Sequence, residues 1–174
     1  MNTASNTSSN KITLNSQLLK RFIAGMGFMP TARALSGLSA DIVQQMPEHA
    51  PHSIADIVAH LDFWQTWVLA NIQGDLQTLP ARAALGWPKP RAWDDLLEHV
   101  LAGLEHAQAL CDDTERLQIA FDPDNKIGAS FSTFSVADAL LDIIAVHNAH
   151  HLGQIILLRR MLDVWPPEGG GMTW

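Results

Sequence analysis

Residues 135–158 read S-V-A-D-A-L-L-D-I-I-A-V-H-N-A-H-H-L-G-Q-I-I-L-L, and this stretch decides the fold. It begins with a capping box, in which the Ser135 hydroxyl can accept from the third helical amide while Asp138 reaches back to the first residue. Apolar residues then continue with little interruption and without the alternation that is typical of a strand. The stretch therefore predicts one long helix that ends at about Leu162.

Three further segments carry apolar residues at three- and four-residue spacing, which is typical of amphipathic helices. They are residues 15–37, residues 53–74 and a segment that begins near Arg91 or Ala92 and fades around Cys111. In the first, Pro30 predicts a kink or break because proline removes a helical hydrogen bond. The second opens at Ser53 with S-I-A-D, the same capping signature, and Gly74 is a plausible C-terminal stop.

The linkers between these segments are rich in proline and in turn-forming residues. L-P-A-R-A-A-L-G-W-P-K-P (residues 79–90) precedes the third predicted helix, and D-P-D-N-K-I-G (residues 122–128) forms a turn-rich loop before the fourth. Four helices with one long loop between the third and the fourth predict an all-α four-helix bundle. We expect residues 13–174 to form a single domain and the polar residues 1–12 to be a disordered tail.

Composition excludes several classes of protein. Eleven Lys and Arg against eighteen Asp and Glu give a net charge of −7, so no basic stripe is available to bind nucleic acid. The N-terminus lacks the apolar region of a secretory signal, and no segment approaches the roughly 20 apolar residues of a membrane helix. The single cysteine, Cys111, excludes an intramolecular disulfide and a Cys-rich zinc module. We expect a cytoplasmic protein.

The fourth predicted helix carries H-N-A-H-H-L-G-Q, in which His147 and His151 are four residues apart and share one face. The same face holds Leu140, Ile144 and Leu158, so both imidazoles are expected to point toward the core. Two buried, protonated histidines would repel each other and lose hydration. Neutral imidazoles that share a divalent cation avoid this cost, so the pair predicts two metal ligands.

A third ligand must come from another helix. His60 is the best candidate, because it lies midway along the second predicted helix on an apolar face. Three histidines with open positions would form a reactive metal site, whereas four closed protein ligands would form a structural one. Gln154 lies one turn after His151, so we expect it to hydrogen-bond the free nitrogen of that ligand.

Other chemistries fit the sequence less well. It lacks H-E-x-x-H, the phosphate-binding G-x-x-x-x-G-K-[ST], the nucleophile motif G-x-S-x-G and the Glu-x-x-His spacing of di-iron bundles. Cys111 is interpreted as an inert, small apolar residue. His49 and His52 are expected to be solvated on their loop, and His99 and His106 to lie on the polar face of the third predicted helix. His150 is expected at the surface or in an interface.

The two histidine segments resemble the DinB-like superfamily of metal-dependent four-helix proteins. The resemblance rests on S-I-A-D-I-V-A-H-L-D-F-W and on H-N-A-H-H-L-G-Q-I-I-L-L-R-R followed by W-P-P, and it covers residues 38–167. Members carry a histidine on the second helix and H-x-x-x-H on the fourth, followed by Gly-Gln. These features fall here on His60, His147, His151, Gly153 and Gln154.

The resemblance implies an up-up-down-down bundle with long crossover loops, and frequently a homodimer. It implies a divalent metal, with zinc, nickel and iron all found in the family and all suited to imidazole ligands. Members of known activity are similar to thiol S-transferases or thiol-dependent isomerases that use a low-molecular-weight thiol. The chain departs from the pattern at His150, where an aromatic residue is common, and in its first helix, which contains Pro30.

Three functional hypotheses follow. In the first, the protein is an enzyme whose metal activates a thiol or water for transfer to, or hydrolysis of, a small substrate. In the second, it is a non-catalytic module that binds a metal or small ligand; in the third, the histidines are hydrogen-bonded core residues of a structural dimer. Three basic residues of the linker could meet a carboxylate-bearing cofactor, but a solvated surface position is the favoured interpretation: Arg82, Lys89 and Arg91.

Overall fold

The computed structural model describes residues 16–26 and 29–170, so the predicted tail at residues 1–12 lies outside the described residues. Residues 16–23 form the N-terminal helix. The other α-helices are α2 (Thr31–Leu35), α3 (Ala40–Val43), α4 (Ile54–Gln73), α5 (Trp93–Leu110), α6 (Val136–Ala139) and α7 (His147–Met161). Short 3₁₀ turns lie at Ala83–Gly86, Arg116–Gln118 and Ala129–Phe131. The described part contains no β-strand, and the predicted all-α bundle is confirmed.

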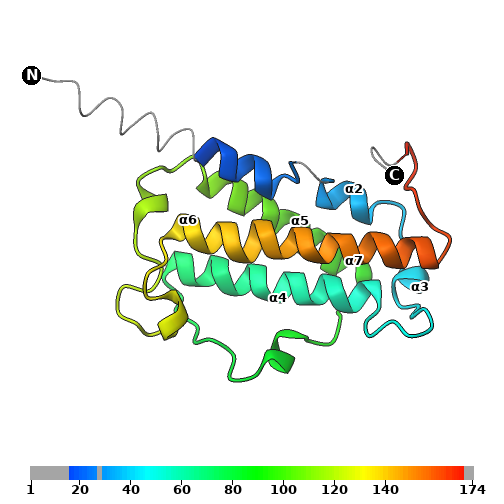
Figure 1. Cartoon of the computed structure of the whole chain (residues 1–174), viewed down its shortest axis with the longest axis horizontal. Coiled ribbons are helices and arrows are strands. Elements are labelled where there is room, and N and C mark those ends of the chain that lie inside the picture. The colour runs from blue at the N-terminus through cyan, green and yellow to red at the C-terminus, as the bar shows by residue number, and fades with distance from the viewer. Residues whose placement is uncertain (1–15, 27–28, 171–174) are drawn as a thin grey trace, which may run out of the picture.

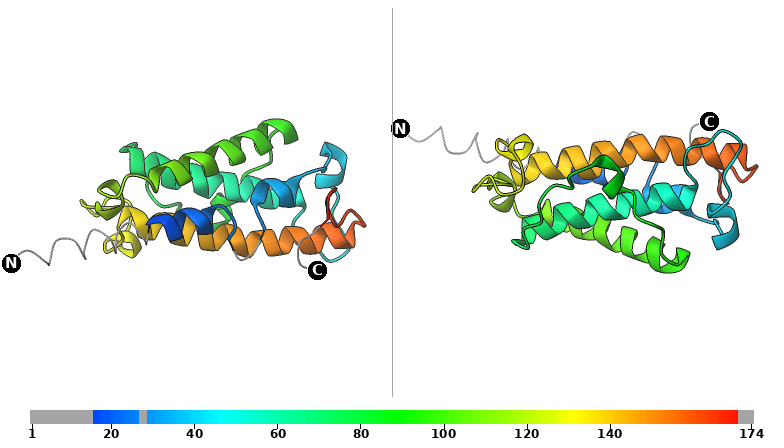
Figure 2. Two further views of the ribbon diagram at one scale, coloured as in Figure 1. Left: turned by 90° about the horizontal axis from the view of Figure 1, so that it is seen from above. Right: turned by 90° about the horizontal axis from the view of Figure 1, so that it is seen from below.

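The directions of the helices differ in order from the expected up-up-down-down. Figure 1 shows α4 and α5 running the same way, opposite to the N-terminal helix and to α6 and α7. The indole of Trp93 donates to the Leu38 carbonyl at 2.9 Å, which places the start of α5 beside the chain that leads into α4. The order is therefore up, down, down, up. The long crossover is residues 74–92, here called the connector, because parallel neighbours α4 and α5 need a link that spans the length of a helix (Figure 2).

Both predicted capping boxes are present. Ser53 accepts from the Asp56 amide at 3.1 Å and its own amide donates to the Asp56 carboxylate at 2.9 Å; Ser135 and Asp138 repeat the arrangement. Gly74 ends α4 in the left-handed conformation with φ 93°, as a C-terminal glycine is expected to do. Local sequence thus determines where the two longest helical segments begin.

The fourth helical segment is not uniformly α-helical. Between α6 and α7 the chain forms a π-helix from Leu140 to Val146, in which hydrogen bonds join residues five apart. The predicted bounds of this helical segment are confirmed, because it runs to Met161. The prediction of one continuous α-helix is wrong, because residues 140–146 form a π-helix. Apolar periodicity over seven residues cannot separate a π-helix from an α-helix, because both present an apolar stripe.

The first predicted segment is broken, as Pro30 indicated, but the break is wider than expected. The N-terminal helix ends at residue 23, and α2 starts directly after Pro30. The guanidinium of Arg159, which is 2% exposed, donates to the carbonyls of Ala34, Ser36 and Val164. This buried arginine fastens the end of α2 and the C-terminal tail to α7.

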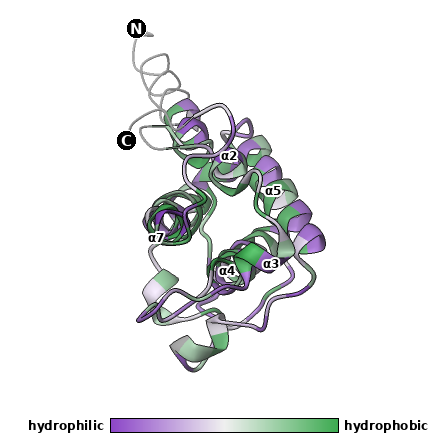
Figure 3. Cartoon of the chain, turned by 90° about the vertical axis from the view of Figure 1, so that its right-hand side faces the viewer, coloured by the Kyte–Doolittle hydropathy of each residue, from purple (hydrophilic) through white to green (hydrophobic). Residues whose placement is uncertain are grey.

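The core lies between the helices of the bundle and is formed by their apolar faces. Seen end-on in Figure 3, α2, α5, α4 and α7 follow one another around the bundle. Helix α4 is buried on most sides, because it packs against both α5 and α7. None of the helices in the described part is both long and apolar enough to cross a membrane.

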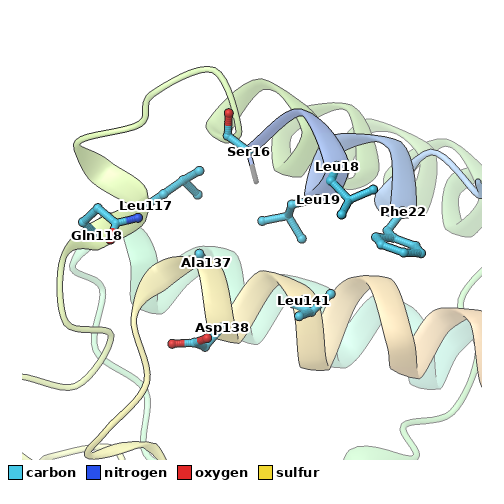
Figure 4. Close-up of a pocket in the computed structure, with 9 residues that line it drawn as sticks. All are labelled: Ser16, Leu18, Leu19, Phe22, Leu117, Gln118, Ala137, Asp138 and Leu141. Carbon is cyan, nitrogen blue, oxygen red and sulfur yellow. The ribbon is translucent and has the colours of Figure 1, made fainter. Parts of the chain in front are cut away.

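An apolar cavity of about 270 Å³ lies at the end of the bundle where the N-terminal helix meets the start of α6. Figure 4 shows Leu18, Leu19 and Phe22 facing Ala137 and Leu141 across this space. No histidine lines it among the described residues, so it is separate from the histidine cluster discussed next.

Candidate metal centre

Three histidines from two helices meet inside the bundle. His60 lies in the middle of α4, whereas His147 and His151 lie on the first turn and the second turn of α7. The Nε2 atom of His147 is 3.1 Å from the Nε2 atoms of both His60 and His151, and one nitrogen from each ring lies within 4.8 Å of the others. We refer to these residues as the triad. The structure thus brings together all three residues that the sequence singled out.

The neighbours of the triad determine which ring nitrogens carry protons. Nδ1 of His60 lies 2.5 Å from the Gly86 carbonyl, which can only accept, so this Nδ1 is protonated and donates. Nδ1 of His151 donates in the same way to Oε1 of Gln154 at 2.7 Å. In a neutral imidazole the other nitrogen, Nε2, then carries a lone pair. Two lone pairs therefore point at Nε2 of His147, an arrangement that only a shared cation or proton satisfies fully.

His147 is held differently from its partners. Its Nδ1 is buried and makes no hydrogen bond of good geometry within the described part of the chain, although the Ile143 carbonyl favours a proton there. Burial, together with the nearby His151 and His60, lowers the pKa of His147 to about 4. An imidazole with this pKa is neutral at pH 7 and presents a lone pair, as a metal ligand must.

The same physical cause acts on the other two rings. Burial lowers the pKa of His60, and the Gly86 carbonyl partly offsets this effect. Burial also lowers the pKa of His151, with Gln154 acting in the opposite direction. All three imidazoles are therefore held neutral, so no proton has to be removed before a cation binds at neutral pH.

The connector encloses His60. The indole of Trp87 lies between the rings of His52 and His60, with centroids 3.9 Å apart and planes within 11° on each side. Gly86 approaches Trp64 so closely that a Cβ there would lie 2.9 Å from the indole Nε1. A larger residue here would displace either the Trp64 indole or the backbone whose carbonyl contacts His60. His52 was expected at the surface, but this stacking half-buries it.

A second polar cluster anchors the end of the connector. The buried carboxylate of Asp62 accepts from Nδ1 of His99 at 2.5 Å and forms an ion pair with Arg91. These contacts join α4, α5 and the connector two residues after His60. His99 was expected to be only part of the polar face of α5, and Arg91 a solvated linker residue; both instead bind this buried carboxylate.

Two cavities reach the triad. The larger, of about 550 Å³, is lined by His151, Gln154 and Trp87 and continues over the apolar Leu157 and Met161 of α7. The smaller, of about 330 Å³, is lined by His60 and His147. The triad is therefore accessible to small molecules, although two of its three rings are buried.

The other residues singled out by the sequence lie outside this cluster. His150 is exposed and accepts from Nε2 of Gln154 at 3.2 Å, and His49 is exposed on its loop. Cys111 is fully buried; burial raises the pKa of its thiol to about 11, so it is not a nucleophile at neutral pH. Arg82 and Lys89 are exposed, and neither lines a cavity that reaches the triad.

Sequence reasoning missed the residues that support the triad from the connector. Gly86 and Trp87 lie in a proline-rich stretch with no helical period, so pattern analysis gives them no face to share with His60. The one available signal is the glycine, because a residue without a side chain is used where the backbone approaches another group closely.

The chain was compared with known proteins. Neither the curated proteins nor the solved structures gave a match. The family profile described as the DinB superfamily matches residues 29–155, a span that contains the connector and all three histidines. With this match over most of its length and a histidine triad at the expected positions, the chain belongs to the DinB superfamily.

Proposed function

We propose that His60, His147 and His151 bind one divalent cation, with zinc, nickel and iron as the candidate ions. The observation that carries the proposal is the direction of the lone pairs: Nδ1 of His60 and Nδ1 of His151 donate elsewhere, which leaves both Nε2 atoms facing His147. The hydrogen bond that His151 donates to Gln154 is the kind that orients a metal ligand. In a purely structural role, a single proton on Nε2 of His147 would have to serve both lone pairs, whereas one cation can bind all three nitrogens.

We further propose that the protein is a metal-dependent enzyme acting on a small substrate in the cytoplasm. A divalent cation held by three histidines keeps open positions and can lower the pKa of a bound thiol or water. The chain's own residues hold the imidazoles neutral, orient them through Gly86 and Gln154, and leave two cavities for organic ligands. Transfer of a low-molecular-weight thiol, or hydrolysis, fits this arrangement.

The alternative is a metal-binding or ligand-binding module without catalysis. One observation favours it: among the described residues, no carboxylate or other general base outside the triad is hydrogen-bonded to the three histidines. Saturable binding of a small ligand without turnover would distinguish this alternative from the enzyme. A homodimer is proposed for either case, and exposed apolar side chains on the N-terminal helix and on the turn after it support it: Leu18, Phe22 and Met26.

Elemental analysis of untagged protein tests the metal site directly. We expect about one divalent ion per chain in the wild type and a loss of most of it in His147→Ala. His106→Ala is the matched control, because His106 lies on α5 and is not part of the triad. Equal metal content in the wild type and His147→Ala would exclude the site, whereas metal without turnover on any thiol and electrophile pair would favour the module.

A further inference from the structure

The smaller of the two cavities beside the triad contains a carboxylate. Its walls are aromatic and apolar, formed by Trp64, Leu79 and Phe131, and His60 and His147 lie along it. Asp142 also lines it, and with the histidines neutral it is the one charged side chain among the described residues that do so. A single anionic group at the exposed edge of an apolar cavity beside the triad is a feature that selects a ligand by charge.

The π-helix places Asp142 in this cavity. Asp142 and His147 are five residues apart, which in an ideal α-helix corresponds to about 500° of rotation and leaves them about 140° apart. In the π-helix Leu140–Val146, hydrogen bonds join residues five apart, so such residues lie close to one another along the helix. The local change in winding therefore brings the carboxylate to the side of the bundle that His147 faces. An α-helix over the same residues would turn it away.

The walls of the cavity complement the carboxylate in recognising positive charge. Trp64 and Phe131 present aromatic rings, which attract cations through their π-electrons, most strongly when water is excluded. The protein also carries a net charge of −7, which favours the approach of cationic ligands over anionic ones. Carboxylate, aromatic rings and overall charge thus favour the same class of ligand.

We propose that this cavity binds a small ligand that carries an ammonium group, with the ammonium held by Asp142 and by the rings of Trp64 and Phe131. The inference rests on the proposed function, because the rest of the ligand would face the cation at the triad. It adds a charge preference that three histidines alone do not provide. Asp142 acts here as a specificity-determining residue rather than as a metal ligand.

Three small thiols that differ in charge test the proposal on protein loaded with Co²⁺. They are thiocholine, 2-mercaptoethanol and 3-mercaptopropionate, which carry a positive, a neutral and a negative group respectively. The quaternary ammonium of thiocholine has no lone pair, so it cannot itself coordinate the metal. Dissociation constants are obtained from the change in visible absorption of Co²⁺ on titration. We expect wild-type protein to bind thiocholine about tenfold more tightly than 3-mercaptopropionate.

Replacement of the carboxylate should remove this preference. Asp142→Asn keeps the size of the side chain at an exposed position, and we expect the tenfold ratio to fall below about twofold while Co²⁺ is still bound. Asp95→Asn is the matched control, because it makes the same change of charge at an exposed position of α5 that does not line the cavity. It should retain the ratio.

The outcomes separate this inference from the proposed function. If Co²⁺ binds but the wild type shows no charge preference, or if Asp142→Asn retains the preference, the ammonium site is wrong and the metal site stands. An equal loss in Asp95→Asn and Asp142→Asn would assign the preference to overall charge and also overturn the site. If the triad binds no Co²⁺, the proposed function itself fails.

Discussion

His60, His147 and His151 are identical in type, but each is held by a different neighbour. His60 donates to a backbone carbonyl, His151 donates to a side-chain amide, and His147 has neither contact. The two donors fix the tautomers of their rings, and the third ring completes the cluster between them. The roles of the three residues are therefore distinguishable by single substitutions.

Gln154→Leu removes the acceptor for Nδ1 of His151 while keeping a side chain of similar volume. We expect the affinity for a divalent ion to fall about 10- to 100-fold, because the ring loses the bond that fixes its tautomer and orientation. Competition with a chelator measures the dissociation constant. Gln73→Leu, at an exposed position at the end of α4, should change it less than about twofold. Equal constants for wild type and Gln154→Leu would contradict the role of Gln154.

The metal-free protein should lose stability in mild acid because of the triad. The pKa of His147 is about 4 in the folded state, whereas a histidine in the unfolded chain titrates near about 6.5. Between these values the unfolded state binds more protons, so the free energy of unfolding falls as the pH drops from about 6.5 to about 4. His60 and His151, whose pKa values are also lowered, act in the same direction.

Urea unfolding of metal-free protein at pH 7 and pH 5 measures this dependence. Carboxylates contribute to the slope in both proteins, so the informative quantity is the difference between the wild type and His147→Gln. We expect the free energy of unfolding to fall less between pH 7 and pH 5 in His147→Gln than in the wild type, since glutamine takes up no proton in this range. Parallel pH profiles would show that His147 is not held neutral by the fold.

At the scale of the element, the connector supplies the neighbours of His60, although the three histidines themselves lie on α4 and α7. Its carbonyl at Gly86 orients His60, Trp87 covers the same ring, and the ion pair of Arg91 with Asp62 fixes its end. Sequence periodicity located the helices on either side of it correctly, because apolar spacing is a local property. The same reasoning gave no role to the connector, because its contacts with His60 join residues that are far apart in sequence and belong to no common helical repeat.

Gly86→Ala tests the connector. The added Cβ would lie 2.9 Å from Trp64 Nε1, so either the backbone or the indole must move and the carbonyl should lose its contact with His60. We expect metal affinity to fall about tenfold or more. Gly153→Ala is the control, because a Cβ at that helical position meets nothing within 4 Å. An unchanged affinity in Gly86→Ala would show that His60 does not depend on the connector.

The π-helix is a second element that the sequence did not reveal. It follows the capping box of Ser135 and Asp138 and precedes His147, so helix boundaries were predictable while the winding between them was not. The wider winding is confined to residues 140–146, but it sets the position of Asp142 relative to His147. Insertions of this kind are frequent at functional sites.

At the scale of the whole molecule, Arg159 joins parts of the chain that lie far apart in sequence. Its guanidinium donates to two carbonyls near the end of α2 and to one in the C-terminal tail. Burial lowers the pKa of this side chain, but a guanidinium remains charged, so its hydrogen bonds offset the cost of burying that charge. These bonds hold the end of α2 and the start of the C-terminal tail against α7.

Arg159→Leu should destabilise the fold by about 2–4 kcal/mol, because it leaves buried carbonyls without donors. Chemical denaturation measures the loss. Arg82→Leu, at an exposed position of the connector, should change the free energy of unfolding by less than about 0.5 kcal/mol. A loss in Arg159→Leu no larger than in Arg82→Leu would contradict the role of the buried arginine.

The sequence by itself determined the helical class, the starts of α4 and α6, and the pairing of His147 with His151. These features depend on residues within about one turn of each other, where capping and helical spacing act. Only the tertiary structure decided that His60 meets His147, 87 positions away, and that Gly86 and Trp87 enclose it. The tertiary structure also decided the directions of the helices and the placement of Asp142 beside the cavity. Packing between distant segments sets such contacts, and no local pattern encodes the packing.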